Sequence, residues 1–225
     1  MERTKRTEML LGKEATDKLN NARVAVFGVG GVGSYTVEAL ARAGIGAIDV
    51  IDKDKVDESN INRQLIALYS TLGRDKAEVA KDRILDINPD CRVNAISMFF
   101  LPENECDFDF DSYDYVVDAV DNVSAKLSLI KKCKETKTPI ICSMGTGNKL
   151  NPCGFKVADI SKTSVCPLAK IVRTECKKRG YKNVKVVYSE EEPIKTSERT
   201  PGSVSFVPSA AGLIIASEVI KDLIK

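Results

Sequence analysis

The sequence predicts an α/β protein with a Rossmann-like, doubly wound and mainly parallel sheet, and two observations support this fold class. Short apolar runs rich in Val, Ile and Ala alternate with longer segments of helical periodicity along much of the chain. The first run, Arg23 to Phe27, is followed at once by clustered glycines and then by a helical segment. Strands that are buried on both faces and joined by crossover helices produce this alternation.

Before Gly145, predicted strands and helices follow one another in order. Asn88-Pro89 marks a helix end, because the residue before a proline is biased away from helical backbone. Further strands are expected at 47–51, 92–97, 113–118 and 139–143, after the strand 23–27. Helices are expected at 8–20, 32–43, 63–69, 75–88 and 123–136.

After Gly145 the alternation becomes irregular, since Gly, Asn and Pro interrupt residues 145–152. The remaining chain predicts strands at 155–160 and 184–188, helices at 167–179 and 208–225, and a charged loop at 189–202. We therefore expect a single domain, 1–225, with two appended parts. Residues 1–22 would form an N-terminal helical arm, and 145–225 a smaller C-terminal strand–helix extension.

Composition narrows the class of protein. The chain has 225 residues, and 43% of them are apolar, enough for a full core without disulfides. Its 34 basic and 32 acidic side chains leave a formal charge of +2, which argues against a whole-surface nucleic-acid binder. The N-terminus lacks the apolar segment of a signal peptide, and no apolar run reaches the roughly 18 residues of a membrane span. We expect a soluble, cytoplasmic protein with no membrane association.

Two absences limit the chemistry. The sequence contains no histidine, which removes every Ser–His and Cys–His mechanism. Its seven cysteines include no Cys-x-x-Cys pair, so a structural zinc site is not expected. Catalysis must therefore use carboxylates, Arg, Lys, Cys, backbone dipoles or a metal ion.

The glycine run GVGGVG, residues 28–33, is a GxGxxG motif between a predicted strand and a helix. Its first glycine permits a tight turn, its second lets the backbone approach a phosphate, and its third lets helix and strand pack closely. Asp52 ends the second predicted strand, where a carboxylate can accept hydrogen bonds from ribose hydroxyls. The sequence therefore predicts a nucleotide-binding site, and this motif alone would favour NAD over ATP.

Four motifs that follow reverse this preference. They are IDKDKV (51–56), NINRQ (60–64), GRDK (73–76) and DAVDN (118–122). This ordered set resembles the adenylating superfamily of ubiquitin-activating enzymes and the bacterial thiamine- and molybdopterin-type adenylyltransferases. The resemblance covers about residues 9–145.

The resemblance implies an ATP-binding adenylating site that works with Mg²⁺. Attack at the α-phosphorus of ATP and departure of pyrophosphate need cationic groups, which Arg, Lys and Mg²⁺ supply. The residues implied as catalytic are Arg63, Lys76 and Asp121, and Asp121 would bind the metal. The implied cofactor-binding set also contains Gly28, Gly30, Gly31, Gly33, Asp52, Asp54, Asn60, Gln64 and Asn122.

Within this set, Asp52 would hold the ribose, and Asn60 and Gln64 would join Arg63 and Lys76 around the phosphates. Asn122 would support the loop that carries the metal-binding carboxylate. Asp118, three residues before Asp121 at the strand end, would share in the function of the site or would merely fix this loop. An isolated Arg or Lys on a helix is usually a solvated charge, so both cationic roles depend on the motif set.

Further stretches resemble the tRNA threonylcarbamoyladenosine dehydratases over nearly the whole chain. They are residues 6–15, 31–54, 145–152, 166–169 and 200–213. The resemblance implies adenylation of the threonyl carboxylate of that modified base at position 37 of tRNA, followed by cyclisation with release of AMP. Residues 145–225 would then form the substrate side of the molecule. It also implies a homodimer, in which Arg6 enters the partner's ATP site, and sulfur-transfer partner proteins.

Two features of the extension have competing interpretations. A basic cluster would contact tRNA phosphates or would form an ordinary solvated face. Its members are Lys170, Arg173, Lys177, Lys178, Arg179, Lys182 and Lys185. Cys166 would form a thioester intermediate or would be an ordinary structural cysteine. Ring closure within one molecule does not require a thiol, because proximity supplies much of the rate.

Three other functions compete with the tRNA-modifying enzyme. An adenylyltransferase acting on the C-terminal glycine of a small ubiquitin-like sulfur-carrier protein would share the ATP site. A nicotinamide-dependent oxidoreductase would share only the glycine loop, and a nucleotide-binding regulator would lack catalysis. The set of Arg63, Lys76 and Asp121 speaks against the last two.

Overall fold

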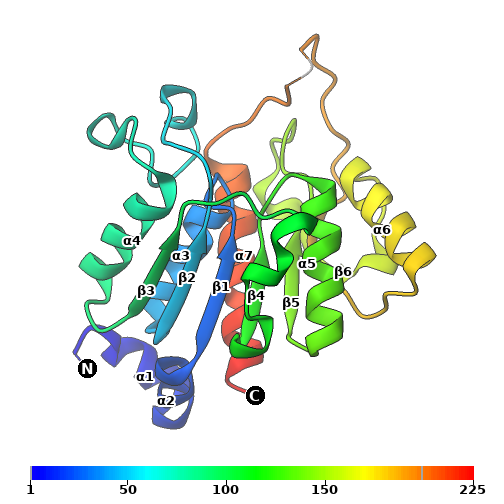
Figure 1. Ribbon diagram of the computed structural model, residues 1–225. Helices are drawn as coiled ribbons and strands as arrows, with labels where there is room; N and C mark the ends of the chain where they lie inside the picture. The colour runs from blue at the N-terminus through cyan, green and yellow to red at the C-terminus, as the bar shows by residue number, and fades with distance from the viewer. Residues whose placement is uncertain (1, 199) are drawn as a thin grey trace.

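The seven strands of the computed structural model, which describes residues 2–198 and 200–225, form one sheet (Figure 1). They lie in the order β3-β2-β1-β4-β5-β7-β6, and every neighbouring pair is parallel except β6 and β7. The strands are Arg23–Phe27 (β1), Ala47–Ile51 (β2), Arg92–Ile96 (β3), Tyr115–Asp118 (β4), Ile140–Ser143 (β5), Phe155–Asp159 (β6) and Lys185–Ser189 (β7). The predicted doubly wound, mainly parallel fold is confirmed.

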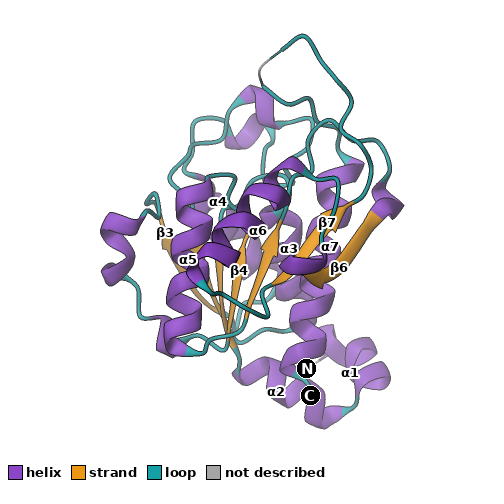
Figure 2. Ribbon diagram, turned by 90° about the vertical axis from the view of Figure 1, so that its right-hand side faces the viewer, coloured by secondary structure: helices purple, strands orange, loops and turns teal. Residues whose placement is uncertain are grey.

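Helices cover both faces of the sheet, and α5 and α7 lie on opposite sides of it in Figure 2. The helices are Lys5–Leu11 (α1), Lys13–Asn21 (α2), Gly33–Ala43 (α3), Lys76–Ile87 (α4), Val123–Thr136 (α5), Pro167–Arg179 (α6) and Phe206–Leu223 (α7). No helix among residues 2–198 and 200–225 has the length and apolar character to cross a membrane.

The pleat of each strand divides the core between these two helical layers. In β1, Val24 and Val26 pack with α3 and α7. Ala25 and Phe27 point to the other face of the sheet and belong to a second apolar cluster, which includes residues of α5 and α6. Successive side chains of a strand point to opposite faces, so a strand buried on both sides reads as a continuous apolar run. The ring of Phe27 has its centroid 5.0 Å from that of Phe100, which closes the second cluster beneath the carboxyl ends of the strands.

The N-terminal arm contains two helices, so the single helix predicted at 8–20 is wrong. Gly12 separates α1 from α2 with φ +87° and ψ 163°, a conformation that favours glycine. Leu19 in α2 is fully buried, and its carbonyl accepts a hydrogen bond from Gly46 N–H at 3.1 Å. The arm therefore docks at the amino ends of the strands, close to both termini of the chain in Figure 1. Met1, at the start of the predicted arm, lies outside the described residues.

The helix predicted at 63–69 is also wrong, because this segment forms successive turns. Arg63 N–H and Gln64 N–H both donate to the carbonyl of Asn60, and Leu65 N–H donates to the Ser34 hydroxyl at 3.2 Å. A hydrogen bond to a neighbouring side chain replaces one that a helical ladder would need. The segment instead packs along α3 beside the glycine loop.

The close approach of α7 to α3 depends on Gly212. A Cβ atom at this position would lie 2.3 Å from the carbonyl oxygen of Val32, and Thr36 Oγ1 donates to the Gly212 carbonyl at 3.0 Å. The predicted terminal helix is thus a core helix that docks on the sheet.

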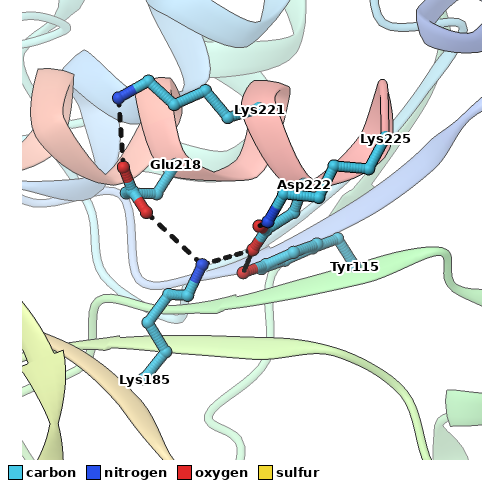
Figure 3. A network of polar contacts seen from close by, with 6 residues as sticks. All are labelled: Tyr115, Lys185, Glu218, Lys221, Asp222 and Lys225. Carbon is cyan, nitrogen blue, oxygen red and sulfur yellow. Dashed lines mark hydrogen bonds and ion pairs between the residues drawn. The ribbon is translucent and has the colours of Figure 1, made fainter.

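A polar network fastens the end of α7 to the amino ends of β4 and β7 (Figure 3). Lys185 Nζ lies 2.5 Å from Asp222 Oδ2 and 3.3 Å from Glu218 Oε2, and the Tyr115 hydroxyl donates to Asp222 at 2.8 Å. Partial burial by itself raises the pKa of Asp222, but hydrogen bonds from Lys185, Lys225 and Tyr115 outweigh it and lower the pKa to about 2.

Asp222 should therefore stabilise the fold in a pH-dependent way. Its folded-state pKa lies below the unfolded value of about 3.9, so its contribution is present above about pH 5 and is lost as the pH falls toward about 2. In urea titrations, the difference in free energy of unfolding between wild type and Asp222→Asn should be constant from about pH 7 to 5 and should shrink below about pH 4. A difference that stays constant at low pH would contradict the assignment.

Candidate functional site

A cavity of about 720 Å³ opens at the carboxyl ends of β1, β2 and β4. It lies where the strand order reverses between β1 and β4, the usual position of ligands in open parallel sheets. Its wall comes from segments far apart in the sequence: the glycine loop, the ends of β2 and β3, residues 60–64, and residues 119–122. Thr146 and Ser203 add a contribution from the extension.

The structure brings the sequence-predicted site residues together around this cavity. Those that line it are Gly28, Gly30, Gly31, Asp52, Asp54, Asn60, Arg63, Gln64, Lys76, Asp121 and Asn122. Gly33 is the exception, because it lies behind the loop. A Cβ atom at Gly33 would fall 1.8 Å from the carbonyl oxygen of Gly28, so this glycine permits α3 to begin against the loop.

Gly28 and Gly30 differ in how much space the protein leaves for a side chain. Gly28 has φ +87°, and its Cβ atom would lie 2.8 Å from the carbonyl oxygen of Ala119. Around Gly30 the nearest protein atom to a Cβ would be Gln64 Nε2 at 3.7 Å. The protein therefore leaves the space at Gly30 open toward the cavity, where a ligand backbone or phosphate can approach.

Asp52 organises two loops at once. Its Oδ2 atom accepts a hydrogen bond from Val29 N–H at 2.8 Å, and its Oδ1 atom accepts one from Asp54 N–H at 2.9 Å. Each oxygen keeps a second lone pair, because a carboxylate offers about four acceptor sites. The carboxylate can thus hold the glycine loop and still accept from a ligand hydroxyl.

Two cationic side chains reach the cavity in different environments. Lys76 is buried, with Nζ 3.4 Å from Asp54 Oδ2, while Arg63 is half-buried and donates through Nη1 to the Ser59 carbonyl at 2.8 Å. Burial by itself would raise the pKa of Asp54, but Lys76 and Lys53 outweigh it and hold the pKa below its usual value. Asp54 therefore stays charged and keeps the Lys76 ammonium at the cavity wall.

Gln64 has a hydrogen-bonding capacity that the described protein does not use. The side chain is 7% exposed, and its Oε1 atom is buried with no partner among residues 2–198 and 200–225. Buried polar groups are normally paired, so an unpaired amide beside Gly30 fits a site that a polar ligand completes. Asn60 is already engaged, since its Oδ1 atom accepts from Asp57 N–H at 3.2 Å.

The loop after β4 presents an acidic side chain at the cavity. Asp121 is exposed and makes no hydrogen bond or ion pair within the described part of the chain, and Asn122 Oδ1 accepts from Ala125 N–H at 2.9 Å. No group of three His, Cys, Asp or Glu residues among those described could hold a metal on its own. One free carboxylate still suits Mg²⁺, which commonly takes one or two carboxylates plus phosphate oxygens and water.

Several cavity residues were missed by the sequence analysis. Met98, Phe99 and Phe100 follow β3 and form an apolar wall, with Lys53 Nζ 4.9 Å from the centroid of the Phe99 ring. Their signal was available, because the carboxyl ends of parallel strands meet at one edge of a sheet. Ser203 and Pro208 carried no such signal, since a loop path sets the position of Ser203 and the docking of α7 sets that of Pro208.

Three other predicted features lie away from the cavity. Arg6 is exposed on α1, at the opposite edge of the sheet. The basic helix α6 exposes Lys177 and Lys178, while Arg173 donates to the Thr163 carbonyl at 2.7 Å. Cys166 is buried, with an exposed fraction of 1%.

Gly30 and Gly33 should respond differently to alanine. Gly33→Ala should destabilise the free protein by roughly 1–3 kcal/mol, because its Cβ would meet the backbone of Gly28. Gly30→Ala should leave the melting temperature of the free protein unchanged and weaken nucleotide binding about tenfold, because the added methyl enters the space for the phosphates. Thermal unfolding with and without ATP measures both effects, and wild-type affinity in Gly30→Ala would contradict this division.

Comparison with known proteins identifies a family and close relatives for this chain. The ThiF family model matches residues 4–225. The chain is 46% identical over 238 residues to the tRNA threonylcarbamoyladenosine dehydratase of Bacillus subtilis, covering 98% of this chain and 94% of the relative.

The fold is also similar to crystal structures of the Escherichia coli tRNA N6-threonylcarbamoyladenosine dehydratase, TcdA, in complex with AMP and in complex with ATP. Each has a TM-score of 0.93 and 36% identity, covers 99% of this chain, and is itself covered to 94% for AMP and 93% for ATP. The resemblance seen in the motifs is confirmed, and the chain belongs to the ThiF family.

Proposed function

We propose that this protein is an ATP-dependent tRNA threonylcarbamoyladenosine dehydratase. It adenylates the threonyl carboxylate of threonylcarbamoyladenosine at position 37 of tRNA, and cyclisation then releases AMP. The observation that carries the proposal is the match to the Bacillus subtilis dehydratase along 98% of the chain, including the extension beyond the nucleotide cavity. An adenylyltransferase that activates a sulfur carrier is less favoured, because the probable adenylyltransferase/sulfurtransferase MoeZ of Mycobacterium tuberculosis aligns with only 52% of the chain.

ATP is proposed to occupy the cavity with its phosphates against the glycine loop. The N–H groups at the start of α3 and the open space at Gly30 favour an anion there. Asp52 would accept from the ribose, while the apolar wall of Met98, Phe99 and Phe100 suits a planar base. The unpaired amide of Gln64 would gain a hydrogen-bond partner in the occupied site.

The charged residues are proposed to stabilise the adenylation step. The acceptor carboxylate attacks the α-phosphorus, an acyl–adenylate bond forms, and pyrophosphate leaves with the electron pair of the broken bond. Lys76, fixed by Asp54, and Arg63 would offset negative charge on the phosphates. Asp121 would hold Mg²⁺, which supplies Lewis-acid stabilisation of phosphate charge when bound.

Cyclisation needs no separate nucleophile in this proposal. An atom of the same modified base attacks the activated carbonyl carbon. AMP leaves as the bond between that carbon and the phosphate oxygen of the acyl–adenylate breaks. Both groups belong to one molecule, so orientation supplies much of the acceleration. The burial of Cys166 is in keeping with a structural thiol.

Partners remain part of the proposal. The exposed lysines of α6 would contact tRNA phosphates, and each contact would release about one counterion. A homodimer would cover exposed apolar side chains such as Tyr69, Phe206 and Leu213, and would let Arg6 reach the ATP site of a second copy. We also infer a cytoplasmic location and sulfur-transfer partners from the same resemblance.

Nucleoside mass spectrometry tests the proposed reaction directly. With ATP and Mg²⁺, tRNA that carries threonylcarbamoyladenosine should lose one water per modified base and release AMP. Asp121→Asn should reduce this rate by roughly 100-fold or more, because it removes the charge that would hold the metal. Asp107→Asn is the acidic control, because Asp107 is exposed at the end of the short 3-10 helix Pro102–Asp107 and does not line the cavity, and it should retain wild-type activity.

A comparison of acceptors separates this proposal from the sulfur-carrier alternative. Unmodified tRNA should not stimulate AMP formation, and neither should a purified sulfur-carrier protein. AMP formation stimulated by the carrier protein alone would overturn the proposal and support the sulfur-carrier adenylyltransferase.

A further inference from the structure

A fully buried ion pair lies behind the cavity, outside the set of predicted site residues that line it. Asp118 ends β4, Lys126 is one turn into α5, and both side chains have an exposed fraction of 0%. Lys126 Nζ lies 3.0 Å from both carboxylate oxygens of Asp118 and donates to the Ser143 carbonyl at 2.7 Å. All three N–H bonds of the ammonium are therefore directed at protein acceptors.

This pair fixes both ends of the loop that carries Asp121. Val120 N–H donates to Asp118 Oδ1 at 3.2 Å where the loop begins. Where it ends, Lys126 N–H donates to the Asn122 carbonyl at 3.0 Å, within the capped first turn of α5. The four residues between Asp118 and Val123, which line the cavity, thus span a gap whose two sides the same ion pair joins.

Lys126 also reaches the neighbouring strand. Ser143 is the last residue of β5, and the chain runs from it to Thr146, which lines the cavity from the extension. One ammonium group therefore connects the loop beside the nucleotide with the loop that leads to the substrate side.

Stability alone is a weak reason for such a pair. Removing two charges from water costs several kcal/mol per ion, and well-packed apolar replacements are often neutral or stabilising. Burial raises the pKa of the Asp118 carboxyl, and its contacts with Lys126 oppose that rise. An ionic pair at this depth is better explained by the geometry it imposes on the loops around it.

We propose that Lys126 is a positioning residue. It holds Asp118 and the Ser143 carbonyl in place, so that residues 119–122 keep Asp121 at the correct position relative to the nucleotide, its Mg²⁺ and Thr146. The inference rests on the proposed function. Lys126 itself does not line the cavity and acts through these groups.

The test uses a double variant, Asp118→Asn with Lys126→Met, which leaves no unpaired charge in the core. Its free form should melt within a few degrees of wild type, because no buried ion is left without a partner. The Mg²⁺ concentration for half-maximal stabilisation by ATP should rise about tenfold, and kcat for pyrophosphate release should fall more than KM for ATP changes. An unchanged Mg²⁺ requirement would overturn the proposal.

A second variant keeps the test decisive if the double variant does not fold. Lys126→Arg keeps the charge but moves the donor atoms, so it should raise the Mg²⁺ requirement several-fold with the fold retained. A wild-type Mg²⁺ requirement in Lys126→Arg, where the double variant is unfolded, would assign the pair a structural role alone.

Lys185→Met is the matched control. It removes a different ion-paired lysine, whose two acidic partners, Glu218 and Asp222, are drawn in Figure 3. Lys185 begins β7, so it lies at the amino ends of the strands, away from the cavity. It should lower the melting temperature and leave the Mg²⁺ requirement unchanged, and a change equal to that of the Lys126 variants would overturn the positioning role. Wild-type protein that neither binds ATP nor releases pyrophosphate would contradict the proposed function, whereas an active wild type with unaltered variants contradicts only this inference.

Discussion

The contact between Gly28 and Gly33 is the constraint on which the rest of the site depends. Only the absence of a side chain at Gly33 lets the first turn of α3 lie against the Gly28 carbonyl, since a Cβ atom would fall 1.8 Å from that oxygen. This approach places the N-terminal end of α3 directly behind the glycine loop, and in that loop Val29 N–H donates to Asp52. The glycine loop also touches Ala119, which joins it to the loop that carries Asp121.

Carboxylates in this structure hold loops as well as facing the cavity. Asp52 fixes the glycine loop, Asp54 fixes Lys76, and Asp118 fixes the segment that carries Asp121. Asp121 differs from these three, because it makes no hydrogen bond or ion pair within the described residues. An unpaired, exposed carboxylate among fixed ones is available to a ligand or metal, which supports the role proposed for it.

Strand positions were predictable from the sequence because short, continuous apolar runs such as Arg23 to Phe27, which alternate with helical segments, are typical of strands buried on both faces. The motif resemblance grouped Asp52, Arg63 and Asp121. Strand geometry explains why Asp52 and Asp121 meet, because parallel strands bring their carboxyl ends to one edge, whereas Arg63 lies in the turns after β2 and its position depended on the resemblance alone. The break at Gly12 and the turns at 63–69 were not, since they depend on tertiary partners such as the Ser34 hydroxyl. Lys126 was missed for the same reason, because a lysine in a helix reads as a solvated charge until its neighbours are known.

The central claim is that this cavity holds ATP with Mg²⁺ and not a dinucleotide, and calorimetric titration of the wild-type protein tests it most directly. The site set that includes Arg63, Lys76 and Asp121 predicts that ATP with Mg²⁺ binds more tightly than NAD and raises the melting temperature more. Removing Mg²⁺ should weaken ATP binding and leave the affinity for NAD unchanged. Tighter binding of NAD than of ATP, or ATP binding that is indifferent to Mg²⁺, would contradict the account.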